Sequence, residues 1–268
     1  MPDAMQFSNE QDAATLERFI TRLEFRATDP TFVAYGEAYL ALLDLPHAAA
    51  VLDLGCGTGV MARAIAARDD FACSVTGVDQ SPDFIAAAER LAAGAGIAFV
   101  VGDAHALDLP AAGFDAVVAH TLVSHVRDPR ALLAQAARVT RPGGSVAIFD
   151  GDYASLTFGC CDPQLGAEVE AALQSVIMSM PRVMRELPRL LPQAGLRLTA
   201  TQAHVLAEAG TGRFFLNLAE TYAPLAASTG LMPAARVEAW LADQRRSAAD
   251  GTFFAACNYY AYVAMAAA

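Results

Sequence analysis

The sequence predicts an α/β fold in which a parallel sheet is covered by helices on both faces. Between residues 51 and 150, short and almost continuously apolar segments alternate with segments whose apolar residues recur at helical spacing. Parallel strands have this composition because both of their faces are buried, and helices form the crossovers between them. The segment 51–59, Val-Leu-Asp-Leu-Gly-Cys-Gly-Thr-Gly, supports the same fold because it is typical of a buried strand that turns tightly into a helix.

Two helices are expected ahead of the first strand. Apolar residues recur at helical spacing over residues 16–23, and Pro30 interrupts this pattern before a second one follows at residues 32–43. Residues 1–9 show no such pattern and are expected to be frayed. We therefore expect residues 1–46 to form a helical flank or lid beside the sheet.

Residues 47–150 are expected to form the ligand-binding core of the sheet. A helix should follow the glycines from residue 60, and Ser81-Pro82 is a typical helix start, with serine as the N-cap and proline at the first helical position. Residues 141–144, Arg-Pro-Gly-Gly, are expected to form a sharp turn. The strands expected in this core span residues 51–54, 72–78, 97–101, 114–119 and 145–149.

The last part of the chain is expected to cap and complete the sheet. Residues 151–195 contain small residues, methionines and prolines but no clear strand, so we expect a cap insertion there. No repeat or linker divides the chain, so residues 1–268 are expected to be one domain. Residues 196–268 should supply a strand at 196–206, helices at 213–227 and 233–247, and a closing strand at 252–265.

The glycine-rich loop predicts a ligand site. Three glycines at alternate positions allow a ligand to approach the backbone, and the helix after them offers unpaired N–H groups. Two kinds of ligand fit the loop taken alone. Residues 57–62 match the Gly-x-Gly-x-x-Ala pattern of dinucleotide sites, and Asp79 lies about 20 residues further on, where a ribose-binding acid belongs.

Three acids favour a ligand other than a dinucleotide. Asp53, Asp79 and Asp103 each follow one of the first three strands, so they project from the same edge of the sheet. Such a set suits a polyhydroxyl, cationic or amine-bearing ligand. A pyrophosphate would be repelled by an acid placed directly before the glycines.

The ordered set of motifs resembles the class I S-adenosylmethionine-dependent methyltransferases. The likeness is closest to the small-molecule group related to the ubiquinone/menaquinone C-methyltransferases. It covers about half of the chain and is carried by VLDLGCGTG (51–59), GVDQS (77–81), GDAHALDLP (102–110), FDAVVAHTLVSHVRDP (114–129) and RVTRPGGSVAIFD (138–150).

The resemblance implies a Rossmann-like, seven-stranded, mostly parallel sheet with an antiparallel last strand and helical caps. It also implies that the cofactor is S-adenosylmethionine, with S-adenosylhomocysteine as the product. Asp53 would lie near the cofactor's amino group, and Asp79 would hold both ribose hydroxyls, so Asp79→Ala should weaken cofactor binding with little effect on folding. The other cofactor contacts implied are Gly55, Gly57 and Gly59 at the methionine portion, Gln80, Asp103 and Ala104 at the adenine, Ala119 and His120 at the methionine end, and Arg26 at the carboxylate.

The expected chemistry is direct displacement of the methyl group onto a small, largely apolar acceptor. His120 and His125 both follow the fourth strand and are the candidate proton acceptors, because histidine titrates near neutrality. Neither a metal nor a covalent nucleophile is required. An NAD(P)-dependent oxidoreductase, a protein that binds the cofactor without transferring methyl, and one that promotes a rearrangement stay open as alternatives. The acceptor wall is expected to include Met178 and Met180, completed by Phe214, Phe215 and Tyr222.

Composition limits the partners. The net charge of -11 makes nucleic acid an unexpected partner, because a phosphate-binding surface needs positive charge. No apolar run has the length of a membrane span, and the amino terminus lacks the pattern of a signal peptide. Five cysteines without Cys-x-x-Cys spacing suggest reduced thiols and a cytoplasmic protein. The expected partner is a small-molecule acceptor, and the sequence is compatible with a homodimer.

Overall fold

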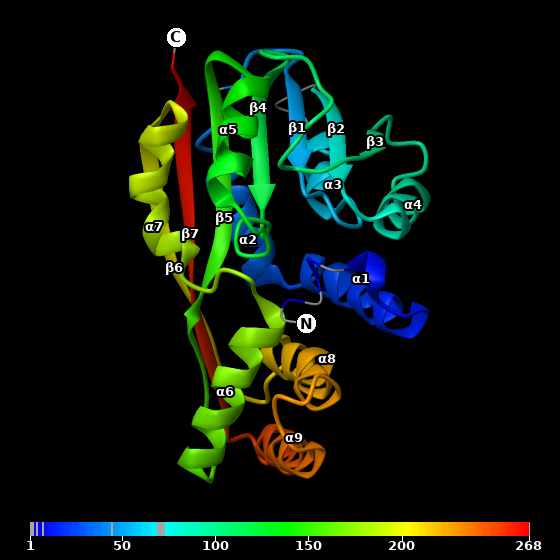
Figure 1. Ribbon diagram of the computed structural model, residues 1–268, viewed down its shortest axis with the longest axis vertical. Coiled ribbons are helices and arrows are strands. Elements are labelled where there is room, and N and C mark those ends of the chain that lie inside the picture. Colours follow the sequence, from blue (N-terminus) through cyan, green and yellow to red (C-terminus); the bar gives the residue numbers. More distant parts are fainter. Residues whose placement is uncertain (1–2, 4, 7, 44, 69–72, 268) are drawn as a thin grey trace.

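The computed structural model describes residues 3, 5–6, 8–43, 45–68 and 73–267, and a seven-stranded sheet runs through its centre (Figure 1). The strand order is β3-β2-β1-β4-β5-β7-β6, and β7 is antiparallel to both of its neighbours. The remaining neighbours pair in parallel. The predicted fold class, a mostly parallel sheet with an antiparallel last strand, is therefore confirmed.

The parallel half of the sheet follows the expected order of strands and helices. Side chains alternate between its two faces, so Val51 packs with one buried cluster while Leu52 and Leu54 pack with the other. Asp53 shares the face of Val51, which is the face that α3 covers. The elements are β1 (Ala50–Leu54), α3 (Val60–Ala66), β2 (Ser74–Asp79), α4 (Pro82–Leu91), β3 (Ala98–Val101), β4 (Phe114–His120) and α5 (Pro129–Val139).

The fifth strand is much longer than expected. β5 spans Thr140–Phe158, so residues 141–144 do not form a separate turn but an irregularity in the pairing with β4, and residues 151–158 are strand rather than cap. The extension is stabilised by β7 (Phe253–Ala266), which is itself paired along its length with β6 (Leu196–Gly210). Local sequence does not reveal such partners, which is why the prediction of a short strand was wrong.

Helices gather around the part of the sheet that extends past β4. In Figure 1, α6 (Pro163–Ile177), α8 (Phe214–Ser228) and α9 (Ala234–Ala249) lie along the lower half of β5, β6 and β7. We call these three helices, together with α1 (Ala13–Ala27) and α2 (Pro30–Leu40), the cap. α1 crosses below the carboxyl edge of the parallel strands and packs against α8.

The expected cap insertion at 151–195 is divided between two places. Only α6 packs against the other cap helices, α8 and α9, whereas α7 (Val183–Leu190) packs against α5 in the buried cluster on the other side of the sheet. Its apolar residues Val183, Met184 and Leu187 lie in that cluster because they occupy one face of the helix.

Within the described residues, no helix is long and apolar enough to cross a membrane.

Candidate functional site

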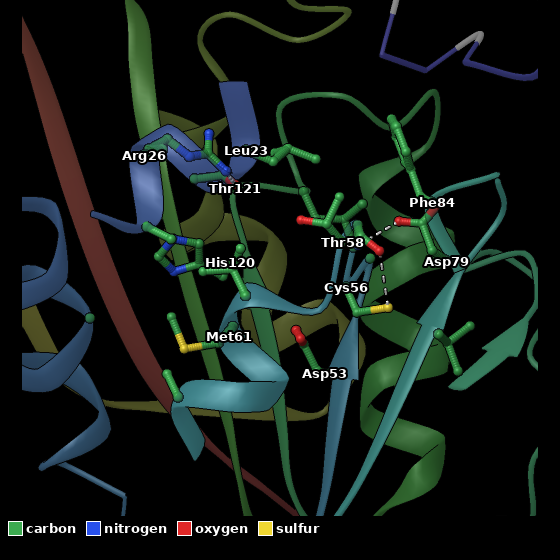
Figure 2. A pocket seen from close by; sticks show the side chains of 18 of the residues that line it. Leu23, Arg26, Asp53, Cys56, Thr58, Met61, Asp79, Phe84, His120 and Thr121 are labelled. Atoms are coloured by element: carbon green, nitrogen blue, oxygen red, sulfur yellow. Dashed lines mark hydrogen bonds between the residues drawn. The ribbon is translucent and has the colours of Figure 1, made fainter. Parts of the chain in front are cut away.

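A cavity of about 820 Å³ opens at the carboxyl ends of β1, β2 and β4. Its walls come from the amino-terminal segment, α1, α2, α3, the glycine loop (residues 55–59) and the turns after β2, β3 and β4. Figure 2 shows Asp53 at the base of this cavity, with Arg26 and His120 to one side and Asp79 to the other. Open α/β sheets bind their ligands at this edge.

The glycine loop adopts a backbone that requires glycine. Gly55, Gly57 and Gly59 have φ values of 71°, 53° and 77°, all in the left-handed region. A Cβ on Gly59 would lie 2.8 Å from Cζ of Phe99, so the ring leaves no room for a side chain. Gly55 N donates to the carbonyl of Val78 at 2.8 Å, which ties the loop to the end of β2.

Asp53 is a buried carboxylate without a hydrogen-bond partner. It is 1% exposed, and neither of its oxygens accepts a hydrogen bond from the described residues. Burial raises the pKa of Asp53, the backbone N–H of Ala62 opposes that effect, and the nearby carboxylate of Asp79 adds to it, so that the pKa is about 7. Burying such a group costs free energy unless a partner compensates it. Because Asp53 faces the cavity, a cationic group of a ligand is the partner that this site can receive.

Asp79 both lines the cavity and holds the loop. Its Oδ2 accepts from Gly57 N and its Oδ1 accepts from Ser81 N, each at 2.9 Å. Burial raises the pKa of Asp79, and these backbone donors oppose that effect. Each carboxylate oxygen can accept a second bond. Asp79 can therefore accept hydrogen bonds from two hydroxyl groups. It also holds the glycine loop in place, a structural role that the sequence-based expectation of little effect on folding did not include.

The third acid lies at the rim. Asp103 is exposed, and its Oδ1 accepts from both N and Nδ1 of His105 at 2.8 Å. Burial acts to raise the pKa of Asp103, but the bonds from His105 outweigh it and leave the pKa lowered. His105 itself lines the cavity with a buried Nε2 that has no partner in the described structure. Sequence reasoning missed His105, although its position two residues after a strand-end acid is the available signal.

Of the other predicted cofactor contacts, some line the cavity and others do not. Ala104 lines the cavity, whereas Ala119 is buried within β4 and does not. Gln80 also lines it, but its side-chain Nε2 donates to Gln6 O at 2.7 Å. This bond fastens part of the amino-terminal segment across the cavity, so the expectation that residues 1–9 are frayed is wrong for the residues of that segment that the structure describes.

Asp3 makes the second attachment of that segment. Its Oδ2 accepts from Ser179 N at 2.7 Å, and its Oδ1 lies 3.0 Å from Nδ1 of His125. Burial opposes protonation of His125, but the carboxylates of Asp3 and Asp150 outweigh burial and raise the pKa of His125. At neutral pH this histidine is therefore held toward its cationic form and is a poor proton acceptor.

His120 has the opposite character. Its Nδ1 lies 2.9 Å from the hydroxyl of Tyr39, and its ring stacks on Phe149 with a centroid distance of 5.0 Å. Burial lowers the pKa of His120 well below the ordinary value, and the positive charge of Arg26 lowers it further. His120 is therefore neutral at neutral pH, and it lines the cavity.

Arg26 lies across the cavity from Asp53. Its Nη2 donates to Thr121 Oγ1 at 2.7 Å, and its guanidinium lies 5.1 Å from the centre of the Phe32 ring. It forms no ion pair with another described residue, so its charge is available to an anionic group. Thr121, which holds it, has a φ of 54° and was not foreseen from the sequence.

A further set of side chains joins α1 to the glycine loop. Glu24 accepts from Thr58 Oγ1 at 2.6 Å and from Arg63 Nη2 at 2.7 Å. The cap and the loop are thus fixed to each other beside the cavity.

Among the described residues, no group of three or more His, Cys, Asp or Glu side chains is placed to hold a metal ion.

Comparisons with known proteins agree with this geometry. Residues 52–148 match the sequence model of the methyltransferase domain family. Over 250 residues, the chain is 29% identical to an uncharacterised 37.1 kDa protein in transposon Tn4556 of Streptomyces fradiae, which covers 92% of this chain and 71% of that protein. It is 32% identical over 125 residues to a ubiquinone biosynthesis O-methyltransferase of Xanthomonas axonopodis pv. citri, which covers 46% of this chain and 49% of that enzyme.

The fold comparison reaches further along the chain. A phosphoethanolamine N-methyltransferase of Haemonchus contortus, solved with S-adenosylhomocysteine, superposes with a TM-score of 0.56 at 18% identity and covers 88% of this chain and 53% of that one. The chain spans about half the length of most of the curated relatives that it matches. The likeness to ubiquinone methyltransferases is therefore distant and partial.

The residues at the cavity fit S-adenosylmethionine. The carboxylate of Asp53, which has no hydrogen-bond partner among the described residues, suits the cofactor's ammonium group, and Gly55 and Gly57 of the glycine loop line the same cavity. Motif order, sheet order and the matched domain family all agree. Residues 52–148 therefore form a methyltransferase domain of the class I S-adenosylmethionine-dependent kind.

Proposed function

We propose that this chain transfers the methyl group of S-adenosylmethionine to a small, largely apolar acceptor by direct in-line displacement. The observation that carries the proposal is the Asp53 carboxylate beside the glycine loop, which has no hydrogen-bond partner among the described residues and lines a cavity walled by α1 and α2. A buried anion there is costly to the empty protein and is useful only to a cationic ligand.

The proposed cofactor contacts follow from the positions of the side chains. Asp53 would pair with the ammonium group and Arg26 with the carboxylate of the methionine portion. Asp79 would accept from the ribose hydroxyls, and the segment from Asp103 to His105 would face the adenine. Gln80 would contribute through its position at the mouth of the cavity, where it holds the amino-terminal segment.

Most of the rate acceleration would come from positioning. When bound, the cofactor supplies an activated methyl group, and the protein has to align the acceptor with it. Such alignment can contribute about 7–11 kcal/mol to lowering a barrier. His120 is the better of the two candidate proton acceptors, because it is neutral and faces the cavity, whereas His125 is paired with Asp3.

Transfer of label tests the proposal. The chain is incubated with methyl-labelled S-adenosylmethionine and a small-molecule extract, with Asp53→Asn as the matched control. We expect label in a low-molecular-weight product with the wild-type chain and far less with the variant. Label that stays in the cofactor while the cofactor binds would favour a protein that does not transfer methyl. Calorimetry that detects NAD(H) but not S-adenosylmethionine would favour the oxidoreductase alternative instead.

A further inference from the structure

We propose that the acceptor is a small organic acid, and that Arg22 receives its anionic oxygen group in a second cavity beside the cofactor site. This inference rests on the proposed function, because it assigns the substrate class of the same enzyme. Four features support it: the position of the second cavity, the unpaired charge of Arg22, the tyrosines around it, and the absence of a carboxylate from its wall.

The second cavity adjoins the first. It has a volume of about 30 Å³ and is formed by the amino-terminal segment, α1, the carboxyl end of α6, α8 and the extended parts of β5 and β7. Both cavities share one dividing wall, so a ligand in the second would lie next to the cofactor. The shared residues are Met5, Leu23, Arg26, Thr121 and His125.

Arg22 is a buried cation without a carboxylate partner. It is 4% exposed, and its Nη1 donates to Phe214 O at 3.1 Å and to Asn217 Oδ1 at 2.8 Å. Its guanidinium also lies 4.3 Å from the centre of the Phe214 ring. Its Nε and Nη2 donate to no acceptor among the described residues, and it forms no ion pair with any of them. Burial lowers the pKa of Arg22 to about 10, so the side chain is still charged at neutral pH.

A second cation, Arg26, increases the free-energy cost of burying the charge of Arg22. Arg26 lies one helical turn further along α1, and after burial its positive charge is the next cause of the lowered pKa of Arg22. Like charges at this spacing destabilise a helix, and burial strengthens the repulsion. Arg26 lines both cavities, whereas Arg22 lines only the second. The cofactor's carboxylate can therefore compensate Arg26 but leaves Arg22 for another anion.

Three tyrosines complete a wall rich in hydrogen-bond donors. Tyr153, Tyr222 and Tyr259 are buried and line the second cavity. Burial raises the pKa of each, so all three keep their protons at neutral pH. Within the described structure, the Tyr222 hydroxyl has no hydrogen-bond partner, and those of Tyr153 and Tyr259 interact with each other.

The rest of the wall explains why the acceptor is small and partly apolar. Among the described residues, no aspartate or glutamate lines the second cavity, which favours an anionic acceptor over an amine. Its apolar side chains include Met5 and Met178, whose flexible thioethers adapt to different shapes. A volume of about 30 Å³ corresponds to about one water molecule, so these side chains and the cap must move when the acceptor enters.

Paired acids and amides test the inference directly. The S-adenosylhomocysteine complex is titrated by calorimetry with benzoate, 4-hydroxycinnamate and octanoate, and with the corresponding neutral amides. We expect at least one acid to bind at least tenfold more tightly than its amide. In Arg22→Met this preference should fall below threefold, while the affinity for S-adenosylhomocysteine changes less than twofold.

Further variants keep the test decisive. Arg18→Met, at an exposed position one turn earlier on α1, should leave the preference unchanged. If Arg22→Met fails to fold, Tyr222→Phe should still weaken binding of the acid by three- to tenfold. The inference is overturned if no acid binds more tightly than its amide, or if the preference survives in Arg22→Met and Tyr222→Phe. A wild-type chain that does not bind S-adenosylhomocysteine would instead refute the proposed function.

Discussion

At the scale of single residues, the ionisation of Asp53 has a measurable effect on stability. Its pKa is near 3.8 in an unfolded chain and about 7 in the folded protein. Between these pH values the Asp53 carboxyl binds more protons in the folded state than in the unfolded state. Its contribution therefore makes the free energy of unfolding fall as pH rises from about 4 to about 7. Asp53→Asn should remove that contribution. We expect urea denaturation to show that the free energy of unfolding of the variant, minus that of the wild type, is more positive at pH 7.5 than at pH 4.5.

The same substitution should have the opposite effect on binding. Loss of a charged partner for the ammonium group should weaken cofactor binding by about 1.5–3 kcal/mol. A variant that binds S-adenosylhomocysteine as tightly as the wild type would contradict the assignment of Asp53. A pH-independent difference in stability would contradict the raised pKa.

Substitution of Asp79 should affect both the stability of the protein and its affinity for the cofactor, and the two effects should be separable. Its carboxylate accepts from Gly57 N and Ser81 N, so Asp79→Ala leaves two backbone donors without their acceptor. We expect Asp79→Ala to lose about 1–3 kcal/mol of unfolding free energy as well as cofactor affinity. Asp79→Asn keeps one acceptor oxygen and should lose affinity with a smaller loss of stability. Calorimetry and urea denaturation of both variants would show whether the two losses separate; equal stability of all three proteins would argue against the loop-holding role.

The pH dependence of turnover tests His120. Because burial and Arg26 hold the pKa of His120 well below the ordinary value of 6.5, a rate that depends on its neutral form should have its acid limb below pH 6.5. If His120 accepts the proton, His120→Ala should reduce turnover by about 10²–10⁴-fold and abolish that limb, with cofactor affinity nearly unchanged. Near-full turnover in both His120→Ala and His125→Ala would mean that positioning alone is sufficient.

At the scale of elements, the end of α6 separates two methionines that the sequence had grouped together. Met178 packs with the cluster under the cap and lines the second cavity, whereas Met180 packs against the cluster on the other side of the sheet. Met178→Ala should therefore change the affinity for the acceptor or for a surrogate acid. Met180→Ala is the matched control and should leave it unchanged. Similar losses in both variants, with lower melting temperatures, would indicate general damage to the core.

At the scale of the whole molecule, the single tryptophan reports on the cap. Trp240 of α9 is fully buried, and its ring lies 5.1 Å from that of Phe158 in the extension of β5. If residues 1–268 form one domain, as we propose, tryptophan fluorescence and far-ultraviolet circular dichroism should give coincident unfolding curves in urea. A fluorescence transition at lower urea than the dichroism transition would show that the cap unfolds separately.

The sequence by itself determined the parts that depend on neighbouring residues. The order strand, acid, glycine loop and helix at residues 51–60 is local, because burial, turn geometry and helix start are each encoded within a few positions. The three strand-end acids, and the two histidines at and just after the end of β4, were predicted for the same reason. Their position at one edge of the sheet follows from parallel strand order alone, and the structure brings Asp53, Asp79 and His120 to one cavity.

Only the tertiary structure decided the features that depend on distant partners. β5 continues to Phe158 because β7 pairs with it, and no pattern within residues 151–158 shows that partner. Among the described residues Asp53 has no hydrogen-bond partner, and Arg22 lies among three tyrosines from β5, α8 and β7, because distant segments of the chain pack around each of them. Burial and pairing of charges are properties of packed surfaces, and they arise between segments that are far apart in the sequence.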